Sequence, residues 1–163
     1  MYKKVMVPLD GSNLAECILP HVEAFISGCQ LNTVVFVRVT EPVPMSSKGG
    51  YQVGEMDYKL IEENTKRIKE ERITSADVYL KGVVNGLKHT GVKFQTEVLV
   101  GNAADRLIDY AEANEVDMIL IATHGRSGVS RWVRGSIADR ILRASRVPVL
   151  MVRAPGTMGE GKD

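Results

Sequence analysis

Apolar positions recur along this chain with two different periods, and segments of the two kinds alternate. Five short segments are rich in β-branched and other apolar residues, as buried strands are; they are residues 2–9, 33–39, 92–100, 116–122 and 147–152. Between them, apolar residues recur every three or four positions, as on one face of a helix; these segments are residues 13–27, 55–85, 102–114 and a last helix that opens at Ser136. The β-α-β-α-β-α-β-α-β order predicts a parallel sheet with helices on both faces.

Three of these segments carry further information about their surroundings. Residues 116–122 form the most hydrophobic run of the chain, continuous rather than alternating after Asp117, which is typical of a central strand covered on both faces. Residues 147–152 contain Pro148, which lacks an amide proton and favours an edge strand or an irregular start. The segment 55–85 predicts one long helix of mixed charge that keeps roughly one face apolar; the residues of that face are Leu60, Ile61, Ile68, Ile73, Ala76, Leu80 and Val84.

Polar residues mark where the predicted helices begin and where loops lie. Ser12 follows a turn at Asp10 and Gly11 and is a good cap for the first helix, and Asn102 caps the third. Residues 41–54 are rich in Pro, Gly and Ser and predict a long mobile loop. The Gly-rich, charged end of the chain predicts a flexible tail. We therefore expect one domain over residues 1–153 and a tail over residues 154–163.

Composition narrows the class of protein. The 163 residues are 44% hydrophobic and 25% charged, as in ordinary soluble globular domains. The net charge of +1 gives no general attraction to nucleic acid or to a membrane surface. Cys17 and Cys29 fall near the two ends of one predicted helix, too far apart for a disulfide. We expect a reduced, cytoplasmic protein with no membrane segment.

Positive charge gathers near the end of the chain. Between Ile121 and Arg153 there is one acidic residue, Asp139, and seven arginines, at positions 126, 131, 134, 140, 143, 146 and 153. Such a patch suits an anionic ligand. Solvated helix faces carry arginines equally often, so the pattern leaves both interpretations open for most of them.

The residues best suited to chemistry follow the first and fourth predicted strands. In parallel α/β sheets, ligands bind beyond the carboxyl ends of the strands, where the strand order reverses. After the fourth strand, glycines at 125, 128 and 135 precede Ser136, which opens a helix. Glycines let backbone amides approach a phosphate, and a helix N-terminus adds unpaired N–H groups. The spacing alone fits a phosphate-binding loop and an ordinary surface loop about equally well.

Motifs at both ends of the chain resemble the universal stress protein family. Nucleotide-binding members carry Gly-x-x-Gly, nine residues, and then Gly-Ser or Gly-Thr. This chain has Ala122 to Gly125, nine residues, and then Gly135 and Ser136. The opening Val-Met-Val-Pro-Leu-Asp-Gly-Ser and the closing Val-Pro-Val-Leu-Met-Val are also similar to that family. The resemblance covers residues 1–153.

The resemblance implies a single-domain, three-layer Rossmann-like fold with a five-stranded parallel sheet in the order 3-2-1-4-5. It also implies an adenine nucleotide, which is ATP, AMP or cyclic AMP, with Mg²⁺ or Mn²⁺ carried by the phosphates. Asp10 would lie near the ribose or that metal, and Val39 near the adenine. The implied nucleotide-binding residues are Pro8, Leu9, Asp10, Val39, Ile121, Ala122, Thr123, His124, Gly125, Arg126, Gly128, Gly135, Ser136 and Ile137.

Ala122 departs from the family pattern, because it replaces the first motif glycine. A negative φ there would tolerate alanine, whereas a positive φ would strain the site. His124 has no acidic neighbour in the sequence, so we assign no catalytic residue. No P-loop, GxGxxG, metal-ligand or GxSxG motif is present.

Three functions follow from these residues. The first is a nucleotide-binding stress-response regulator. The second is a slow ATP hydrolase, and the third is a dimeric interaction module that no longer binds nucleotide. By the same resemblance we expect a homodimer joined through the exposed edge of the last strand; the interface residues are Val147, Val149, Leu150, Met151 and Val152.

Overall fold

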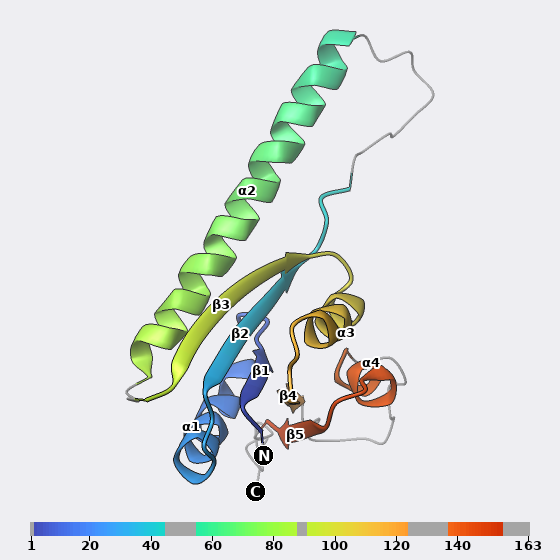
Figure 1. Ribbon diagram of the computed structural model, residues 1–163. Helices are drawn as coiled ribbons and strands as arrows, with labels where there is room; N and C mark the ends of the chain where they lie inside the picture. The colour runs from blue at the N-terminus through green and yellow to red at the C-terminus, as the bar shows by residue number, and fades with distance from the viewer. Residues whose placement is uncertain (1, 45–54, 88–90, 124–136, 155–163) are drawn as a thin grey trace, which may run out of the picture.

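The computed structural model describes residues 2–44, 55–87, 91–123 and 137–154. Its sheet has five parallel strands in the order β3-β2-β1-β4-β5. The strands are β1 (Lys4–Pro8), β2 (Thr33–Thr40), β3 (Lys93–Val100), β4 (Met118–Thr123) and β5 (Val149–Arg153). The predicted fold class and strand order are therefore confirmed, with β3 and β5 at the two edges (Figure 1).

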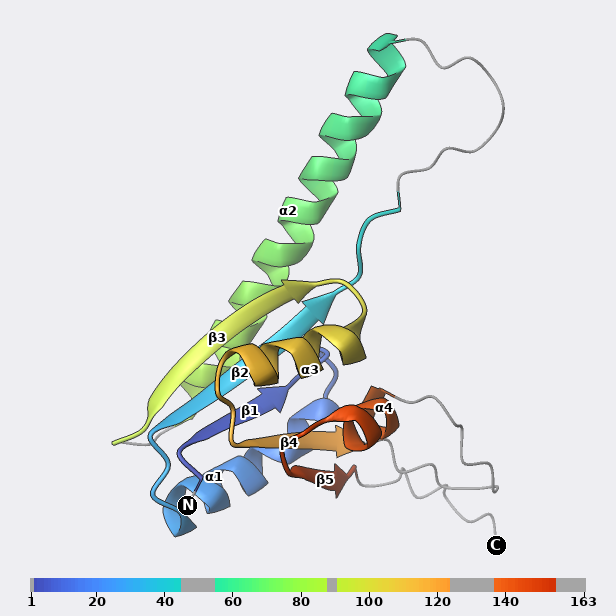
Figure 2. The ribbon, with the colours of Figure 1, turned by 45° about the vertical axis from the view of Figure 1, so that its right-hand side comes forward.

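Helices cover both faces of the sheet. One face carries the 3-10 helix η1 (Ala15–Ile18), α1 (Leu19–Gly28) and α2 (Glu55–Gly86). The other carries α3 (Ala103–Ala113) and α4 (Ile137–Ala144), as Figure 2 shows. Successive side chains of a strand point to opposite faces of the sheet. Val5 and Val7 therefore pack against η1, α1 and α2, and Met6 between them packs against α3 and α4.

The predicted helix over residues 13–27 is interrupted. The chain first makes the 3-10 turn η1, and α1 begins only at Leu19. Pro20 is the reason, because proline is favoured in the first turn of an α-helix, where its missing N–H costs nothing. The prediction that Ser12 caps the first helix is wrong: the residues that precede η1 and α1 are Leu14 and Ile18, and the Ser12 Oγ instead accepts a hydrogen bond of 3.1 Å from the Ala15 amide in the turn before η1. Cys17 and Cys29 are both free thiols, as their spacing required.

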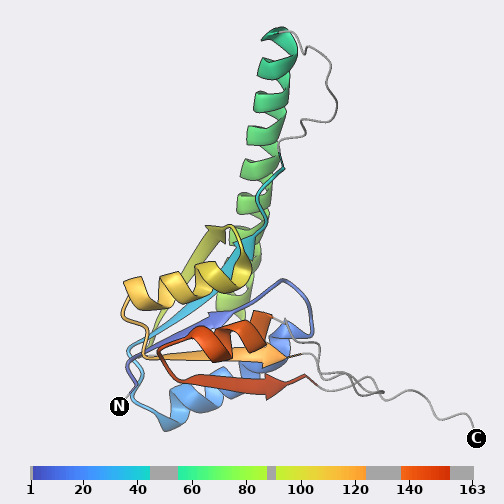
Figure 3. The ribbon, with the colours of Figure 1, turned by 90° about the vertical axis from the view of Figure 1, so that its right-hand side faces the viewer.

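The long helix α2 differs most from what its pattern predicts. Of the seven residues expected on its apolar face, only Ala76 and Leu80 are buried, and Leu60 is 58% exposed. The reason is length, since 32 residues of helix span about 48 Å. Figure 3 shows that the first half of α2 extends well beyond the sheet, so the core can bury only its second half.

No helix among the described residues is long and apolar enough to cross a membrane. The predictions for residues 41–54 and for the C-terminal tail fall largely outside the described residues.

Candidate nucleotide site

The strand order reverses between β1 and β4. From β1 the chain proceeds to β2 on one side, and from β4 it proceeds to β5 on the other. Such a reversal leaves the loops after β1 and β4 diverging in opposite directions. The two stretches that the sequence singled out therefore start side by side at the carboxyl edge of the sheet.

The ladder between β1 and β4 is short at this point. Only Val5 and Met6 pair with β4, opposite Met118 and Ile119, although β1 continues to pair with β2 as far as Pro8. The backbone N–H and C=O of alternate residues of a strand point to opposite neighbours. The Lys4 carbonyl bonds to the Asp117 amide on the β4 side, so Met6 and then Pro8 are the next residues of β1 whose backbone groups point toward β4. Proline has no N–H to donate, and the two strands separate beyond Met6.

Asp10 lies in a tight turn immediately after β1. Its Oδ1 accepts a hydrogen bond from the Ser12 amide at 2.8 Å, and the residue is exposed. Gly11 has a φ of +90°, a backbone conformation that residues with a side chain rarely adopt. The turn-forming role that the sequence allowed for Asp10 is thus present in the structure.

A cluster that sequence reasoning missed supports this turn from behind. The guanidinium of Arg38, in β2, packs against Gly11, where an added Cβ would come within 2.8–3.0 Å of it. The same group lies over the ring of Tyr79 in α2. The Tyr79 hydroxyl donates a hydrogen bond of 2.9 Å to the carboxylate of Glu16 in η1. The turn is therefore held between the sheet and α2.

Burial, followed by the hydrogen bond to Glu16, raises the pKa of the Tyr79 phenol well above its ordinary value of 10.0. This phenol stays protonated at all physiological pH values, so it remains a hydrogen-bond donor. One feature of the sequence could have pointed to this cluster: Arg38 is the single charged residue in the strand TVVFVRVT, and a charge in an otherwise apolar strand needs a partner.

Ala122 lies in β4, paired with Val152, and is half-buried. Among the described residues only Glu115 combines a side chain with a positive φ, so the backbone of Ala122 is unstrained. Of the two alternatives that the sequence left open, the structure shows the one in which alanine is tolerated.

The structure brings together part of the predicted site. Pro8 ends β1 and is followed by Leu9 and Asp10, Val39 lies near the end of β2, and Ile121 to Thr123 end β4. Ile137 begins α4. The rest of the predicted site lies outside the described residues; it comprises His124, Gly125, Arg126, Gly128, Gly135 and Ser136.

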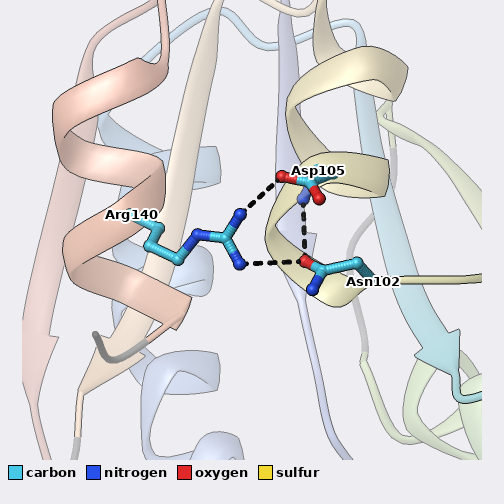
Figure 4. A network of polar contacts seen from close by, with 3 residues as sticks. All are labelled: Asn102, Asp105 and Arg140. Atoms are coloured by element: carbon cyan, nitrogen blue, oxygen red, sulfur yellow. Dashed lines mark hydrogen bonds and ion pairs between the residues drawn. The ribbon is translucent and has the colours of Figure 1, made fainter.

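Three of the arginines from the positive patch form ion pairs with acids. Arg140 in α4 contacts Asp105 at 2.7 Å and Asn102 at 3.2 Å, joining α4 to the start of α3 (Figure 4). Arg143 pairs with Asp139 and Arg146 with Glu112. These three arginines therefore belong to solvated helix surfaces, where they form ion pairs, and they do not form a patch for an anionic ligand.

A separate hollow lies on the α3 side of the sheet. It has a volume of about 430 Å³ and polar walls formed by Lys4, Gln95, Thr96, Glu97, Tyr110 and Asn114. Lys4 begins β1, so this hollow does not belong to the site at the carboxyl edge.

The sequence pattern of the universal stress protein family matches residues 1–153. The chain belongs to this family. Among its relatives, universal stress protein MJ0531 of Methanocaldococcus jannaschii is 29% identical over 95% of this chain and 84% of its own length. The solved structure of MJ0577, from the same organism, is 26% identical with a TM-score of 0.73, covering 95% of this chain and 98% of that one.

Two other universal stress protein structures share the fold and hold nucleotides. One, in complex with cAMP, is 15% identical with a TM-score of 0.58 and covers 94% of this chain and 98% of its own. The other, from Arabidopsis thaliana with AMP bound, is 13% identical with a TM-score of 0.57 and covers 94% of this chain and 92% of its own.

Proposed function

We propose that this universal stress protein binds an adenine nucleotide at the carboxyl ends of β1 and β4 and acts as a nucleotide-dependent regulator. The observation that carries the proposal is the early end of the β1–β4 ladder at Met6 and Ile119. Two parallel strands that stop pairing at a topological switch point leave room for a ligand between their loops.

The described residues would form the nucleoside half of the site. Pro8, Leu9 and Asp10 would lie on one side of the adenosine, with Val39 beside the adenine. The end of β4, from Ile121 to Thr123, would form the opposite wall. Support comes from the family and from the cAMP and AMP held by two structures of the same fold.

The phosphates would lie against the segment between β4 and α4. We assign them to the backbone amides of Gly125, Arg126, Gly128 and Gly135, to the Ser136 hydroxyl, and to the amino end of α4 at Ile137, with His124 and Thr123 beside them. A helix N-terminus offers unpaired N–H groups to an anion. A Mg²⁺ or Mn²⁺ ion would arrive with the phosphates, and Asp10, the first carboxylate after β1 in the sequence, would lie near it.

We also propose that two copies pair through β5. Among the described strands β5 is at one edge of the sheet, so within the described residues one row of its backbone N–H and C=O groups has no neighbouring strand. Met151 on it is 43% exposed. The interface would comprise Val147, Val149, Leu150, Met151 and Val152. A monomer in sedimentation at micromolar concentration would contradict this pairing.

The phosphate assignment is tested by making the loop bulkier. The double variant Gly135→Val/Ser136→Val should lose at least roughly tenfold in affinity for a fluorescent ATP analogue, a loss that corresponds to about 1.4 kcal/mol. Its circular dichroism should match that of the wild type. The control is Gly82→Ala, a glycine in α2 with no atom near its missing Cβ, which should bind as the wild type does. Unchanged affinity in the double variant would contradict the phosphate-loop assignment.

A further inference from the structure

The strand β3 lies at the edge of the described sheet opposite β5 (Figure 1). Its eight residues, from Lys93 to Val100, pair one by one with β2, without a bulge. The strand contains no proline. Short length, bulges, proline and charged residues protect the edge strands of natural proteins against pairing with other strands. Of these four protections β3 has only the last, at Lys93 and Glu97.

Alternate residues of β3 direct their backbone groups to β2 and to the open side. The Lys93 amide donates a hydrogen bond of 2.9 Å to the Asn32 carbonyl, and the Gly101 amide donates one of 3.0 Å to the Thr40 carbonyl. The odd-numbered residues therefore bond to β2, and the even-numbered residues direct their N–H and C=O groups outward. An antiparallel strand can bond to this edge only in registers that pair outward-directed residues with one another.

The two charged residues of β3 lie on one face of the sheet. Phe94 and Val98 pack on the side of α2, and Leu99 packs on the side of α3. Lys93 and Glu97 alternate with the first two, so they lie on the side of α3. Lys93 is exposed and Glu97 is half-buried. Within the described part of the chain, neither side chain forms an ion pair.

One antiparallel register of β3 with its own copy satisfies both the backbone and these charges. With a twofold axis at Gln95, Phe94 of each copy exchanges backbone hydrogen bonds with Thr96 of the other. Lys93 then lies directly opposite Glu97 of the second copy, and the axis repeats this pair. These are the closer, non-hydrogen-bonded positions of an antiparallel ladder, where opposite charges stabilise the pairing.

The neighbouring registers lose both ion pairs. Moving the axis to Phe94 or Thr96 leaves Lys93 and Glu97 opposite uncharged residues. Moving it to Glu97 places the two carboxylates opposite each other, and a parallel copy in register places each charge beside its own kind. Like charges in directly opposed positions are destabilising. The charges therefore select the axis at Gln95.

The helix that covers β3 is anchored toward the centre of the sheet. Tyr79 of α2 lies over Arg38 of β2, one strand in from the edge. Its hydroxyl bonds to Glu16 of η1, which precedes α1 on the same face of the sheet. Both contacts hold α2 away from the outward-directed backbone groups of β3.

We propose that β3 pairs with β3 of a second copy of this chain, antiparallel about a twofold axis at Gln95, with reciprocal ion pairs between Lys93 and Glu97. Such an interface is isologous, since both copies use the same surface. It joins two sheets edge to edge. Because β5 lies at the opposite edge, the two pairings do not compete, and together they would link pairs into longer assemblies. The inference is independent of the proposed nucleotide site.

Disulfide formation between copies tests the register, in a Cys17→Ser/Cys29→Ser background. Gln95→Cys places two thiols in directly opposed positions, where a Cα separation of about 4.5 Å fits a disulfide. Oxidation with copper–phenanthroline should therefore give a covalent dimer on a non-reducing denaturing gel. Leu99→Cys is the matched control on the same face, because eight residues, about 27 Å along the strands, separate its two copies.

Charge reversal tests the ion pairs. Lys93→Glu and Glu97→Lys, each added to Gln95→Cys, should lower the cross-linked fraction at least about fivefold, because each variant opposes like charges in its own pair. A mixture of the two variants should recover cross-linking, since position 93 of one then meets the opposite charge at position 97 of the other. The double variant Lys93→Glu/Glu97→Lys should recover it as well.

The alternative is that Lys93 and Glu97 only keep this edge from pairing. That alternative predicts that Gln95→Cys cross-links no more than Leu99→Cys and that mixing the charge variants recovers nothing, and either result would overturn the proposal. Within one copy the two residues are about 13 Å apart along the strand, so repulsion inside a copy would not be relieved by mixing. Stronger cross-linking of Thr96→Cys than of Gln95→Cys would show another register and overturn it too. Urea unfolding of each variant checks that the fold is kept.

Discussion

The guanidinium of Arg38 lies over the ring of Tyr79, with its central carbon 5.0 Å from the ring centroid. This contact joins β2 to α2 directly behind the turn at Asp10 and Gly11. A change that moves α2 near Tyr79 would therefore also move Arg38 and the turn at Asp10 and Gly11, which we assign to the nucleotide site. The first two predictions concern this cluster.

The Arg38–Tyr79 contact should be measurable as a coupling energy. In a double-mutant cycle with Arg38→Met and Tyr79→Leu, we expect a coupling of roughly 0.5 to 1 kcal/mol in the free energy of unfolding, as for other partly exposed cation–π pairs. Tyr79→Phe, which keeps the ring and loses the hydroxyl, should retain the coupling and cost about 1 kcal/mol for the lost hydrogen bond to Glu16. Additive effects in the cycle would show that the stacking contributes nothing.

Gly11 should tolerate no side chain. Gly11→Ala places a Cβ on a residue with a φ of +90° and pushes it against the Arg38 guanidinium. We expect a loss of roughly 1 to 2 kcal/mol in urea unfolding, which is the usual cost of a left-handed conformation for an L-residue. Gly82→Ala, in the middle of α2 with open space around it, should instead gain up to about 1 kcal/mol. Equal effects of the two substitutions would contradict this account of the turn.

Asp117 should make the protein sensitive to acid. Its Oδ2 accepts hydrogen bonds from the amides of Lys4 at 2.7 Å and Lys3 at 2.8 Å, and these bonds lower the pKa of the carboxyl below its ordinary 3.8. A lowered folded-state pKa stabilises the protein fully above the unfolded-state value, and the stabilisation is lost as pH falls through the folded-state value.

In Asp117→Asn we expect a loss of at most about 1 kcal/mol at pH 7, because solvent screens much of the charge on this largely exposed carboxylate. The difference from the wild type should shrink as the pH falls below about 4, where the unfolded-state carboxyl becomes protonated. Chemical unfolding at pH 7 and pH 3 measures both. A difference that is independent of pH would mean that the carboxylate charge is not what matters.

Glu115 is the second strained turn position. It has a φ of 52° in the link between α3 and β4, and its side chain is exposed. Glu115→Gly should therefore stabilise the fold by roughly 0.5 to 1 kcal/mol, the relief of strain minus the added freedom of glycine in the unfolded chain. Glu112→Gly, inside α3, should destabilise it by about 1 kcal/mol. A melting temperature that falls for both variants would contradict this interpretation.

The layout of the sheet could be predicted from the sequence because each strand is short, apolar and bounded by a turn residue or a cap. The apolar run ending in Ala122 indicated a central strand, and Pro148 indicated an edge strand or an irregular start. The strand order itself came from the family resemblance, since alternation of strands and helices is compatible with several orders.

The misses have local causes. The prediction of one helix over residues 13–27 failed because Pro20 starts a new helix at Leu19, and the spacing of apolar residues alone does not show this effect. Only Ala76 and Leu80 of the predicted apolar face of α2 are buried, because no pattern within the helix tells how far the sheet extends beneath it. Arg38 and Tyr79 are 41 positions apart in the sequence, so only the packing of α2 on β2 shows that they meet.

The central claim is that the carboxyl edge between β1 and β4 binds an adenine nucleotide. The direct measurement is isothermal titration of the purified protein, stripped of carried-over ligand, with ATP, AMP and cyclic AMP, with and without Mg²⁺. We predict binding at micromolar strength, about −8 kcal/mol, with Ala122→Gly binding as tightly as the wild type or more tightly. Absence of binding by all three nucleotides would contradict the claim and leave a paired interaction module whose site has been lost.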